Sequence, residues 1–157
     1  MTFEIELVRQ IRAPKEFVFD WWTDLSPDDS MLVHPLNSRT VLSRSPTEIL
    51  VRDDETIFFR RMQFDVRVTL NRPDSWVAEY DGRVARARST YTLRSLDPSS
   101  NVETQLHYHT EIEPKGSLTG LVSPIAKLIV RRTFVSEFEA FTRALEQDYG
   151  KQKIKSL

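Results

Sequence analysis

The sequence predicts an α+β fold in which a curved, seven-stranded antiparallel sheet packs against a long C-terminal helix. Apolar and polar residues alternate near the N-terminus and again over most of residues 38–113, with the period of two that is typical of strands. Two short helical segments separate these two stretches. From Ser123 onward, apolar residues recur at steps of three and four, which indicates a helix with one buried face.

The N-terminal part is expected to contain one strand followed by two short helices. The strand covers residues 3–12, where Arg9 breaks the apolar parity. Pro14 ends this strand and suits the first turn of a helix, and the apolar side chains of "KEFVFDWWTDL" recur at four-residue steps. A second short helix is expected to begin at Ser26–Pro27, because serine caps helix N-termini, and to end near His34.

Six further strands are expected, because turn-forming residues divide the alternating stretch into six segments. Their expected ranges are 38–44, 47–53, 56–71, 75–81, 83–96 and 102–113. The alternation fails within "TIFFRRM", which indicates a bulge near residues 59–62. With the N-terminal strand, the predicted sheet has seven strands.

The expected hairpins place the apolar side chains of the last three strands on one face. A two-residue turn at Asp81–Gly82 would pair Trp76 with Ala87. A six-residue loop in the next hairpin would pair Tyr91 with Leu106. In this register one face is apolar with scattered hydroxyls and the other is charged, so the apolar face is expected to lie against the C-terminal helix.

The C-terminal helix is expected to begin at Pro124, with Ser123 as its cap, and to end before Gly150. About 25 residues at roughly 1.5 Å each would make a rod about 38 Å long, enough to cross the sheet. Residues 1–150 are therefore expected to form one domain, and residues 151–157 a charged, frayed tail.

Composition excludes several classes of function. The 157 residues carry a formal charge of −1, from 22 Lys plus Arg against 23 Asp plus Glu, so no strong field attracts nucleic acid or an anionic membrane. There is no cysteine, which excludes disulfides, thiolate metal sites and a cysteine nucleophile. No apolar run is long enough to cross a bilayer, and the N-terminus alternates instead of resembling a signal peptide. We expect a cytoplasmic protein without a nucleic-acid partner or membrane insertion.

Two motifs and the order of elements resemble a known family. The motifs are "I.AP.EFVF.WW.D" at residues 11–24 and "FVSEFEAFTRALEQ" in the C-terminal helix. Together they resemble the START/polyketide cyclase (SRPBCC) superfamily, which has the helix-grip fold of the birch-pollen allergen, over roughly residues 2–149. The resemblance implies a cavity between sheet and helix that holds lipids, sterols, hormones or aromatic polyketides, with chemistry in some branches. The turn "SRSPTEI" lacks the glycines of the allergen branch, so the allergen's own ligands are not implied.

The residues themselves also favour a cavity, because large and small side chains alternate on the inward face of the last strands. The alternative is that Trp76, Phe64 and the phenylalanines of the C-terminal helix fill this space themselves. The residues expected to line the cavity are Phe64, Trp76, Tyr80, Ser89, Tyr91, Tyr108, Arg132 and His34.

Several charged residues have two interpretations. Arg9 and Arg132 could bind an anionic ligand group or a carboxylate, or could lay their stems on the sheet with the head in water. His34 could contact a ligand or act as a general base, or could simply favour the negative end of its helix. His107 and His109 have a spacing that can chelate a metal, but both are expected to face outward beside arginine, so no metal site is expected.

The expected inward positions offer hydroxyls but no histidine, carboxylate or lysine, and no nucleophile or phosphate-loop motif is present. This favours binding over catalysis. The first hypothesis is a protein that binds or carries a hydrophobic or amphipathic small molecule without a cofactor. The second is an enzyme of the cyclase or dehydratase type, which an inward ionisable group with a shifted pKa would favour. The third is an interaction module resembling co-chaperone domains of this fold, which an exposed apolar patch would favour.

Overall fold

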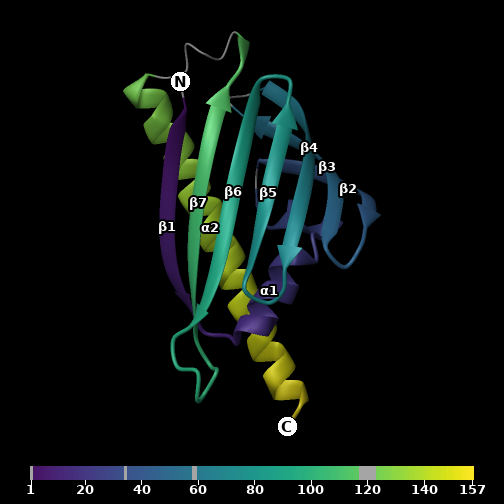
Figure 1. Ribbon diagram of the computed structural model, residues 1–157, viewed down its shortest axis with the longest axis vertical. Helices are drawn as coiled ribbons and strands as arrows, with labels where there is room; N and C mark the ends of the chain where they lie inside the picture. Colours follow the sequence, from purple (N-terminus) through teal and green to yellow (C-terminus); the bar gives the residue numbers. More distant parts are fainter. Residues whose placement is uncertain (1, 34, 58–59, 117–122) are drawn as a thin grey trace.

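A seven-stranded antiparallel sheet packs on one long helix in the computed structural model, which describes residues 2–33, 35–57, 60–116 and 123–157 (Figure 1). The strands are β1 (Phe3–Ile11), β2 (Leu36–Arg44), β3 (Glu48–Ile57), β4 (Arg60–Asn71), β5 (Ser75–Gly82), β6 (Ala85–Ser95) and β7 (Thr104–Pro114). The helices are α1 (Lys15–Thr23), the short 3₁₀ helix η1 (Pro27–Met31) and α2 (Pro124–Lys155). This is the helix-grip arrangement that the sequence predicts.

The strand order β1-β7-β6-β5-β4-β3-β2 explains how the sheet encloses the space beside α2. The chain starts at one edge, and α1 and η1 then carry it to β2 at the opposite edge (Figure 1). From β2 to β7 each strand pairs with the next, until β7 pairs with β1. The connection through α1 and η1 therefore lies on the same side of the sheet as α2.

The helix α2 begins as expected but ends later. The Ser123 hydroxyl accepts a hydrogen bond from the Ala126 backbone N–H at 3.2 Å, and Pro124 occupies the first turn. The helix then continues through Gly150 to Lys155, so the prediction that it ends before Gly150 is wrong. A glycine inside a helix costs only about 1 kcal/mol relative to alanine, and the neighbouring residues favour helix enough to continue it.

Both predicted hairpin registers are wrong by an even number of residues. Trp76 lies opposite Tyr91, not Ala87, and Tyr91 lies opposite Tyr108, not Leu106. The first error arises because Gly82 still belongs to β5, where it pairs with Phe64 on β4, so the chain turns at Arg83–Val84 and the last pair of the hairpin is Asp81 with Arg86. Because an even shift leaves every side chain on its face, the predicted inward face is unchanged.

The predicted bulge near residues 59–62 and the predicted break between the expected strands 47–53 and 56–71 are also wrong. Asp53 and Asp54 lie within β3, and Ile57 at its end pairs with Arg60 at the start of β4. Residues 60–69 pair with β3 in a constant register, while residue 59 falls outside the described residues. The break in alternation marks a reversal of the chain, which resets the parity of the next strand.

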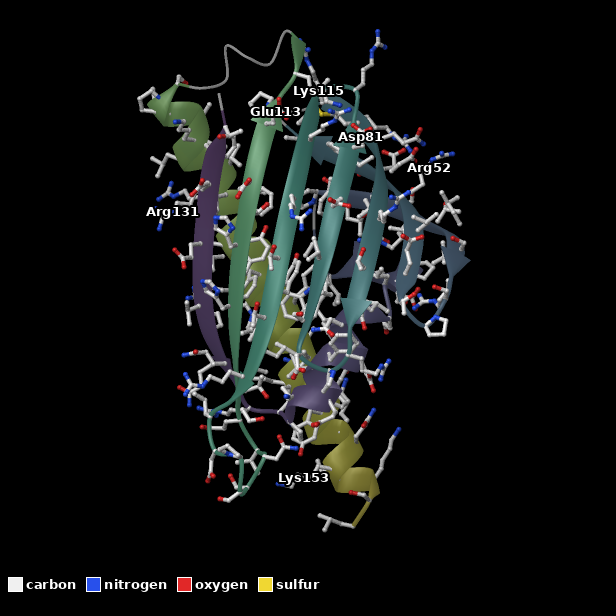
Figure 2. The ribbon with its side chains drawn as sticks, viewed as in Figure 1. Arg52, Asp81, Glu113, Lys115, Arg131 and Lys153 are labelled. Carbon is white, nitrogen blue, oxygen red and sulfur yellow. The ribbon has the colours of Figure 1, made fainter. Side chains whose placement is uncertain are left out.

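The outer face of the sheet carries charged side chains, as predicted from its polar parity (Figure 2). Arg52 forms an ion pair with Asp65 at 2.7 Å on neighbouring strands, and Lys115 reaches Asp81 at 2.7 Å. Arg88 lies opposite Glu111 on β6 and β7. These pairs define a solvated outer surface, so the buried face is the one turned toward α2.

The helix α1 fills one end of the space between sheet and α2. Its Val18, Phe19 and Trp22 are buried, and the Phe19 ring meets the Trp76 ring edge-on at 5.6 Å. The Trp21 indole N–H donates to the Asp148 carboxylate on α2 at 2.9 Å. The opening helix is therefore a core element that joins the sheet to the C-terminal half of α2.

Candidate functional site

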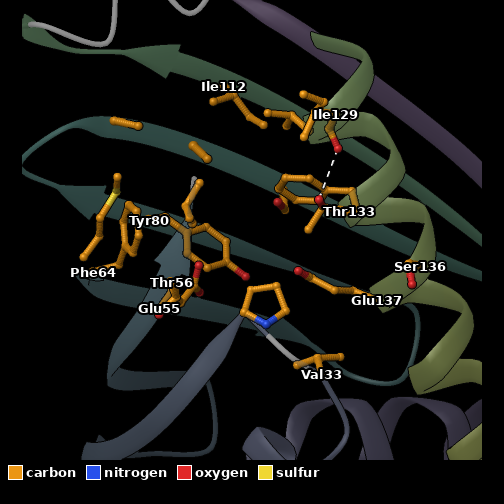
Figure 3. A pocket seen from close by; sticks show the side chains of 18 of the residues that line it. Val33, Glu55, Thr56, Phe64, Tyr80, Ile112, Ile129, Thr133, Ser136 and Glu137 are labelled. Carbon is orange, nitrogen blue, oxygen red and sulfur yellow. Dashed lines mark hydrogen bonds between the residues drawn. The ribbon is translucent and has the colours of Figure 1, made fainter. Parts of the chain in front are cut away.

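A cavity of about 710 Å³ lies between the concave face of the sheet and the N-terminal half of α2 (Figure 3). Its wall is mostly apolar and comes from β1, β3 to β7, the segment after η1, and α2. Apolar residues of this wall include Phe3, Met62, Phe64, Ile112, Ile129 and Phe134. The volume is within the range of roughly 300–1,000 Å³ that is usual for small-molecule pockets.

Small side chains leave this space unfilled. On β6 the inward positions beside the cavity are Ala85, Ala87 and Ser89, and α2 contributes Ser136 and Ala140. Protein interiors are normally close-packed, so the space between a sheet and a helix is filled when large side chains reach into it. Where these side chains are small, the gap remains as a cavity.

Beyond the cavity, the same space is filled by aromatic rings. Trp22 lies 5.3 Å from Phe138, and Tyr91 lies 4.9 Å from Tyr108, between ring centroids. Trp76 stacks on Tyr91 at 4.7 Å and an interplanar angle of 11°. The two alternatives drawn from the sequence, an open cavity and a space filled by rings, therefore each hold in one half of the fold.

A smaller cavity of about 90 Å³ lies among these rings, and three polar residues line both cavities. These are Glu55 on β3, Tyr80 on β5 and Glu137 on α2. Figure 3 shows the Tyr80 hydroxyl on β5 and the Glu137 carboxyl on α2 pointing toward one another. Glu55 lies on β3 of the same sheet as Tyr80. The three groups thus lie where the apolar cavity meets the aromatic end.

The two carboxyl groups have no hydrogen-bond partner among the residues that the structure describes. Both residues are partly exposed, and their surface faces the cavity. Burial raises the pKa of Glu55 to about 8, with a further contribution from the Glu137 charge. Burial alone raises the pKa of Glu137 to about 7. At neutral pH these two groups therefore hold protons that an exposed carboxylate would have lost.

The phenols at this boundary stay neutral. Burial raises the pKa of Tyr80 and of Tyr91 far above the ordinary range, and that of Tyr108 to about 12. Ser89 donates a hydrogen bond to the Thr110 hydroxyl at 2.9 Å, so its oxygen is held against the sheet. These hydroxyls can donate or accept hydrogen bonds to a ligand, but they supply no charge.

A buried ion cluster supports the site from behind. Arg39 donates from Nε and Nη2 to the two oxygens of Asp53, both at 2.8 Å, and from Nη1 to Asp29 at 2.6 Å. Asp53 is fully buried, and its partner Arg39 is nearly so. Because one guanidinium faces two carboxylates, burial outweighs the Arg39 charge and raises the pKa of Asp29 to about 7. The cluster ties η1 to β2 and β3 beside the cavity.

The structure separates the predicted site residues into groups. Phe64, Tyr80, Ser89 and Arg132 line the larger cavity, and Tyr91 and Tyr108 line the smaller one. Trp76 lines neither cavity, because its ring is enclosed between Phe19 and Tyr91. Arg132 is exposed at the edge of the cavity. His34 lies outside the described residues.

The prediction that no carboxylate faces inward is wrong. Glu55 follows two aspartates in "RDDET", a run that resembles a solvated turn, and Glu137 lies within the acidic segment "SEFEAF". A signal was present for Glu55, which shares the parity of the buried Ile49 and Val51 on β3. Continuing the strand past Asp54 would have placed it inward.

The other charged candidates lie away from the cavity. Arg9 pairs with Glu139 on α2 at 3.0 Å, with both side chains partly exposed, so it joins the sheet edge to the helix. His107 and His109 face outward as predicted, with the His107 ring 2.6 Å from Glu6. His109 also lies close to Glu4 and Glu111 on this exposed surface.

Exposed apolar side chains lie at the edge of the cavity and on the neighbouring surface of α2. Leu32 and Ile129 line the cavity and are also exposed, by 38% and 47%. Ile125 and Leu128 on the same helix are exposed by 72% and 56%. We call these four residues the apolar rim. Exposed apolar patches of this kind occur at ligand-binding grooves and at protein interaction sites.

These features define a helix-grip protein with an internal cavity, and solved structures share its fold. Zhui aromatase/cyclase from Streptomyces sp. R1128 matches with a TM-score of 0.77 and 14% identity, over 94% of this chain and 95% of that chain. A START superfamily protein from Mycobacterium smegmatis matches with a TM-score of 0.71 and 15% identity, over 95% and 98%. The di-domain ARO/CYC BexL from the BE-7585A biosynthetic pathway matches with a TM-score of 0.72 and 13% identity. The match covers 94% of this chain and 50% of that chain.

The chain therefore has the START/polyketide cyclase fold that its motifs resemble. No protein-family model matches it, and no curated protein matches its sequence. Within the described residues, no helix combines the length and the hydropathy that crossing a membrane requires.

Proposed function

We propose that this protein binds a hydrophobic or amphipathic small molecule in the 710 Å³ cavity. The observation that carries the proposal is the composition of the wall, which is apolar from the rim inward and has polar groups concentrated at its inner boundary. A molecule with a hydrocarbon or aromatic body and one polar end matches this distribution. The solved structures of the same fold include aromatase/cyclases, which supports a ligand inside the fold.

The proposed ligand contacts follow from position. Phe64 and Ser89 would touch the body of the ligand, Tyr80 its polar end, and Arg132 the part nearest to solvent. Tyr91, Tyr108 and Trp76 would act from behind, by holding the inner boundary in place. A role for His34 rests on its position between Val33 and Pro35, which both line the cavity.

Filling the cavity tests the proposal. The variant Ala87→Phe places a ring in the cavity, and the control Thr90→Phe adds the same ring on the outer face of the same strand. Titration with the neutral fluorescent dye Nile red, alongside native mass spectrometry of the purified protein, is expected to show binding by the wild type and the control only. Equal binding by Ala87→Phe, folded by circular dichroism, would place the ligand elsewhere.

A second candidate is an enzyme of the cyclase or dehydratase type, and the two inward carboxyl groups favour it. A protonated carboxyl could donate to a ketone oxygen while an ionised one removes a proton from a neighbouring carbon, as carbon–carbon bond formation requires. Glu55 and Glu137, with pKa values near neutrality, are suited to these roles. Incubation with a poly-β-ketone thioester tests it: a cyclised product lost in Glu137→Gln supports catalysis, and binding without turnover refutes it.

Three further inferences from the sequence stay predictions. These are a cytoplasmic location, the lack of a nucleic-acid partner, and residues 1–150 as one domain. The exposed apolar side chains of α2 are consistent with the interaction-module hypothesis. Two of the four residues of the apolar rim also line the cavity, however, and this favours a role in ligand entry.

A further inference from the structure

Two carboxyl groups without protein partners meet at the inner boundary of the apolar cavity. From this arrangement we propose that the ligand is a hydrophobic amine, whose ammonium group lies between Glu55, Glu137 and the Tyr80 hydroxyl. This inference rests on the proposed function and specifies the class of its ligand. Three features carry it: the local charge, the number of hydrogen-bond acceptors, and the position of the acids relative to the apolar wall.

The charges around the boundary leave an excess of carboxylates. Among the described residues, Arg39 and Arg132 are the cations that line either cavity. Arg39 is already occupied by Asp53 and Asp29, and Arg132 is exposed at the edge of the cavity. Glu55 and Glu137 therefore have no counter-ion of their own, and burial of an unpaired carboxylate is unfavourable.

The hydrogen-bonding capacity of the site matches an ammonium group. A primary ammonium has three N–H donors and no acceptor. Glu55 from β3, Glu137 from α2 and Tyr80 from β5 offer three acceptors from three different elements at the boundary that the two cavities share. Once the acids are ionised, a fatty acid would instead place a third carboxylate beside two, and an alcohol would leave the two charges without a cation.

The position of the acids explains why the amine must also be hydrophobic. Beyond them the space is closed by the rings of Trp22, Tyr108 and Phe138. In the other direction the wall is apolar up to the rim. A bound amine would therefore place its charge inward and extend its hydrocarbon part toward the entrance.

Proton release gives the proposal a specific pH dependence. The acids must lose protons to pair with an ammonium, and their pKa values of about 7 and 8 are raised by burial. Affinity for the amine is therefore expected to rise with pH, by about tenfold for each pH unit below 7 if one proton is released. The other groups near the boundary are Asp53 and Arg39, which pair with each other, the three neutral phenols, and Asp29 behind Arg39. The pKa of Asp29 is also raised to about 7, so the double variant below separates its contribution from that of Glu55 and Glu137.

Three probes of equal chain length test the inference: decylamine, decanol and decanoic acid, each titrated by calorimetry at pH 6, 7 and 8. Decylamine is expected to bind at least on the order of tenfold more tightly than decanol at pH 8, with the preference shrinking toward pH 6. The double variant Glu55→Gln/Glu137→Gln is expected to lose this preference while still binding decanol. The control Glu139→Gln, on the same helix but paired with Arg9 outside the cavity, is expected to keep it.

The outcomes separate this inference from the proposed function. If decanol or decanoic acid binds as tightly as decylamine at pH 8, or if decylamine affinity does not change with pH, the amine is the wrong ligand class and the cavity remains a binding site. If none of the three probes binds to the folded protein, the proposed function itself fails.

Discussion

Replacing Glu137 by glutamine is expected to make the protein more stable at high pH and to have little effect at low pH. The pKa of Glu137 rises from its ordinary value of 4.5 to about 7, because burial disfavours the charged form. Since a tenfold change in acidity corresponds to about 1.4 kcal/mol, full ionisation costs the fold about 3 kcal/mol. Glutamine has nearly the same shape and no charge to bury.

The sign follows from proton binding. Between pH 4.5 and about 7 the folded protein holds a proton on Glu137 that the unfolded chain has released. This contribution to stability is complete below pH 4.5 and is lost as the pH rises through 7. The free energy of unfolding of Glu137→Gln should therefore equal that of the wild type near pH 4.5 and exceed it by up to about 3 kcal/mol at pH 8.

Urea denaturation followed by circular dichroism at pH 4.5, 6, 7 and 8 measures this difference. Glu139→Gln is the matched control, because its side chain is exposed by 47% and its ion pair lies on the surface. A difference between Glu137→Gln and wild type that stays constant with pH would refute the reasoning, as would a less stable variant at pH 8.

Three other changes test the packing. Arg39→Met leaves Asp53 and Asp29 without their cation and should lower the free energy of unfolding by about 3–5 kcal/mol in urea titrations. Phe19→Ala removes a fully buried ring and should lower the free energy of unfolding by about 3–5 kcal/mol in the same assay. A decrease below about 1 kcal/mol would mean that neighbouring side chains move in to fill the cavity. Gly82→Ala puts a methyl group 2.5 Å from the Phe64 ring, so thermal melting should show a loss of about 1–3 kcal/mol.

The fold could be predicted because each element depends on a local pattern. Alternation assigned the inward faces, and a period-two pattern keeps that assignment even when loop lengths are wrong, as for Trp76 and Tyr91. Loop lengths and strand ends were less accessible, because they depend on the pairing of Gly82 with the neighbouring strand β4. The same holds for Gly150, where a local stop signal is overridden by the helix around it.

Apart from Arg132, the candidate site could be predicted for the residues whose chemistry agrees with burial. Phe64, Tyr80 and Ser89 are compatible with an inward face, and parity alone places them there. Glu55 and Glu137 are hydrophilic, so a carboxylate is expected in water unless tertiary structure encloses it. The parity of β3 could have placed Glu55 inward, but the cavity that encloses both acids forms only between β3 and α2, which are distant in sequence.

Because aromatic rings fill one end of the fold, the cavity is closed at that end, and its depth limits the length of the ligand that it can enclose. A guest anchored at the acids can lengthen only toward the apolar rim, and each methylene it adds should contribute about 0.8 kcal/mol until the chain emerges into water. In a homologous series the chain length at which affinity stops increasing would then measure the depth of the chamber.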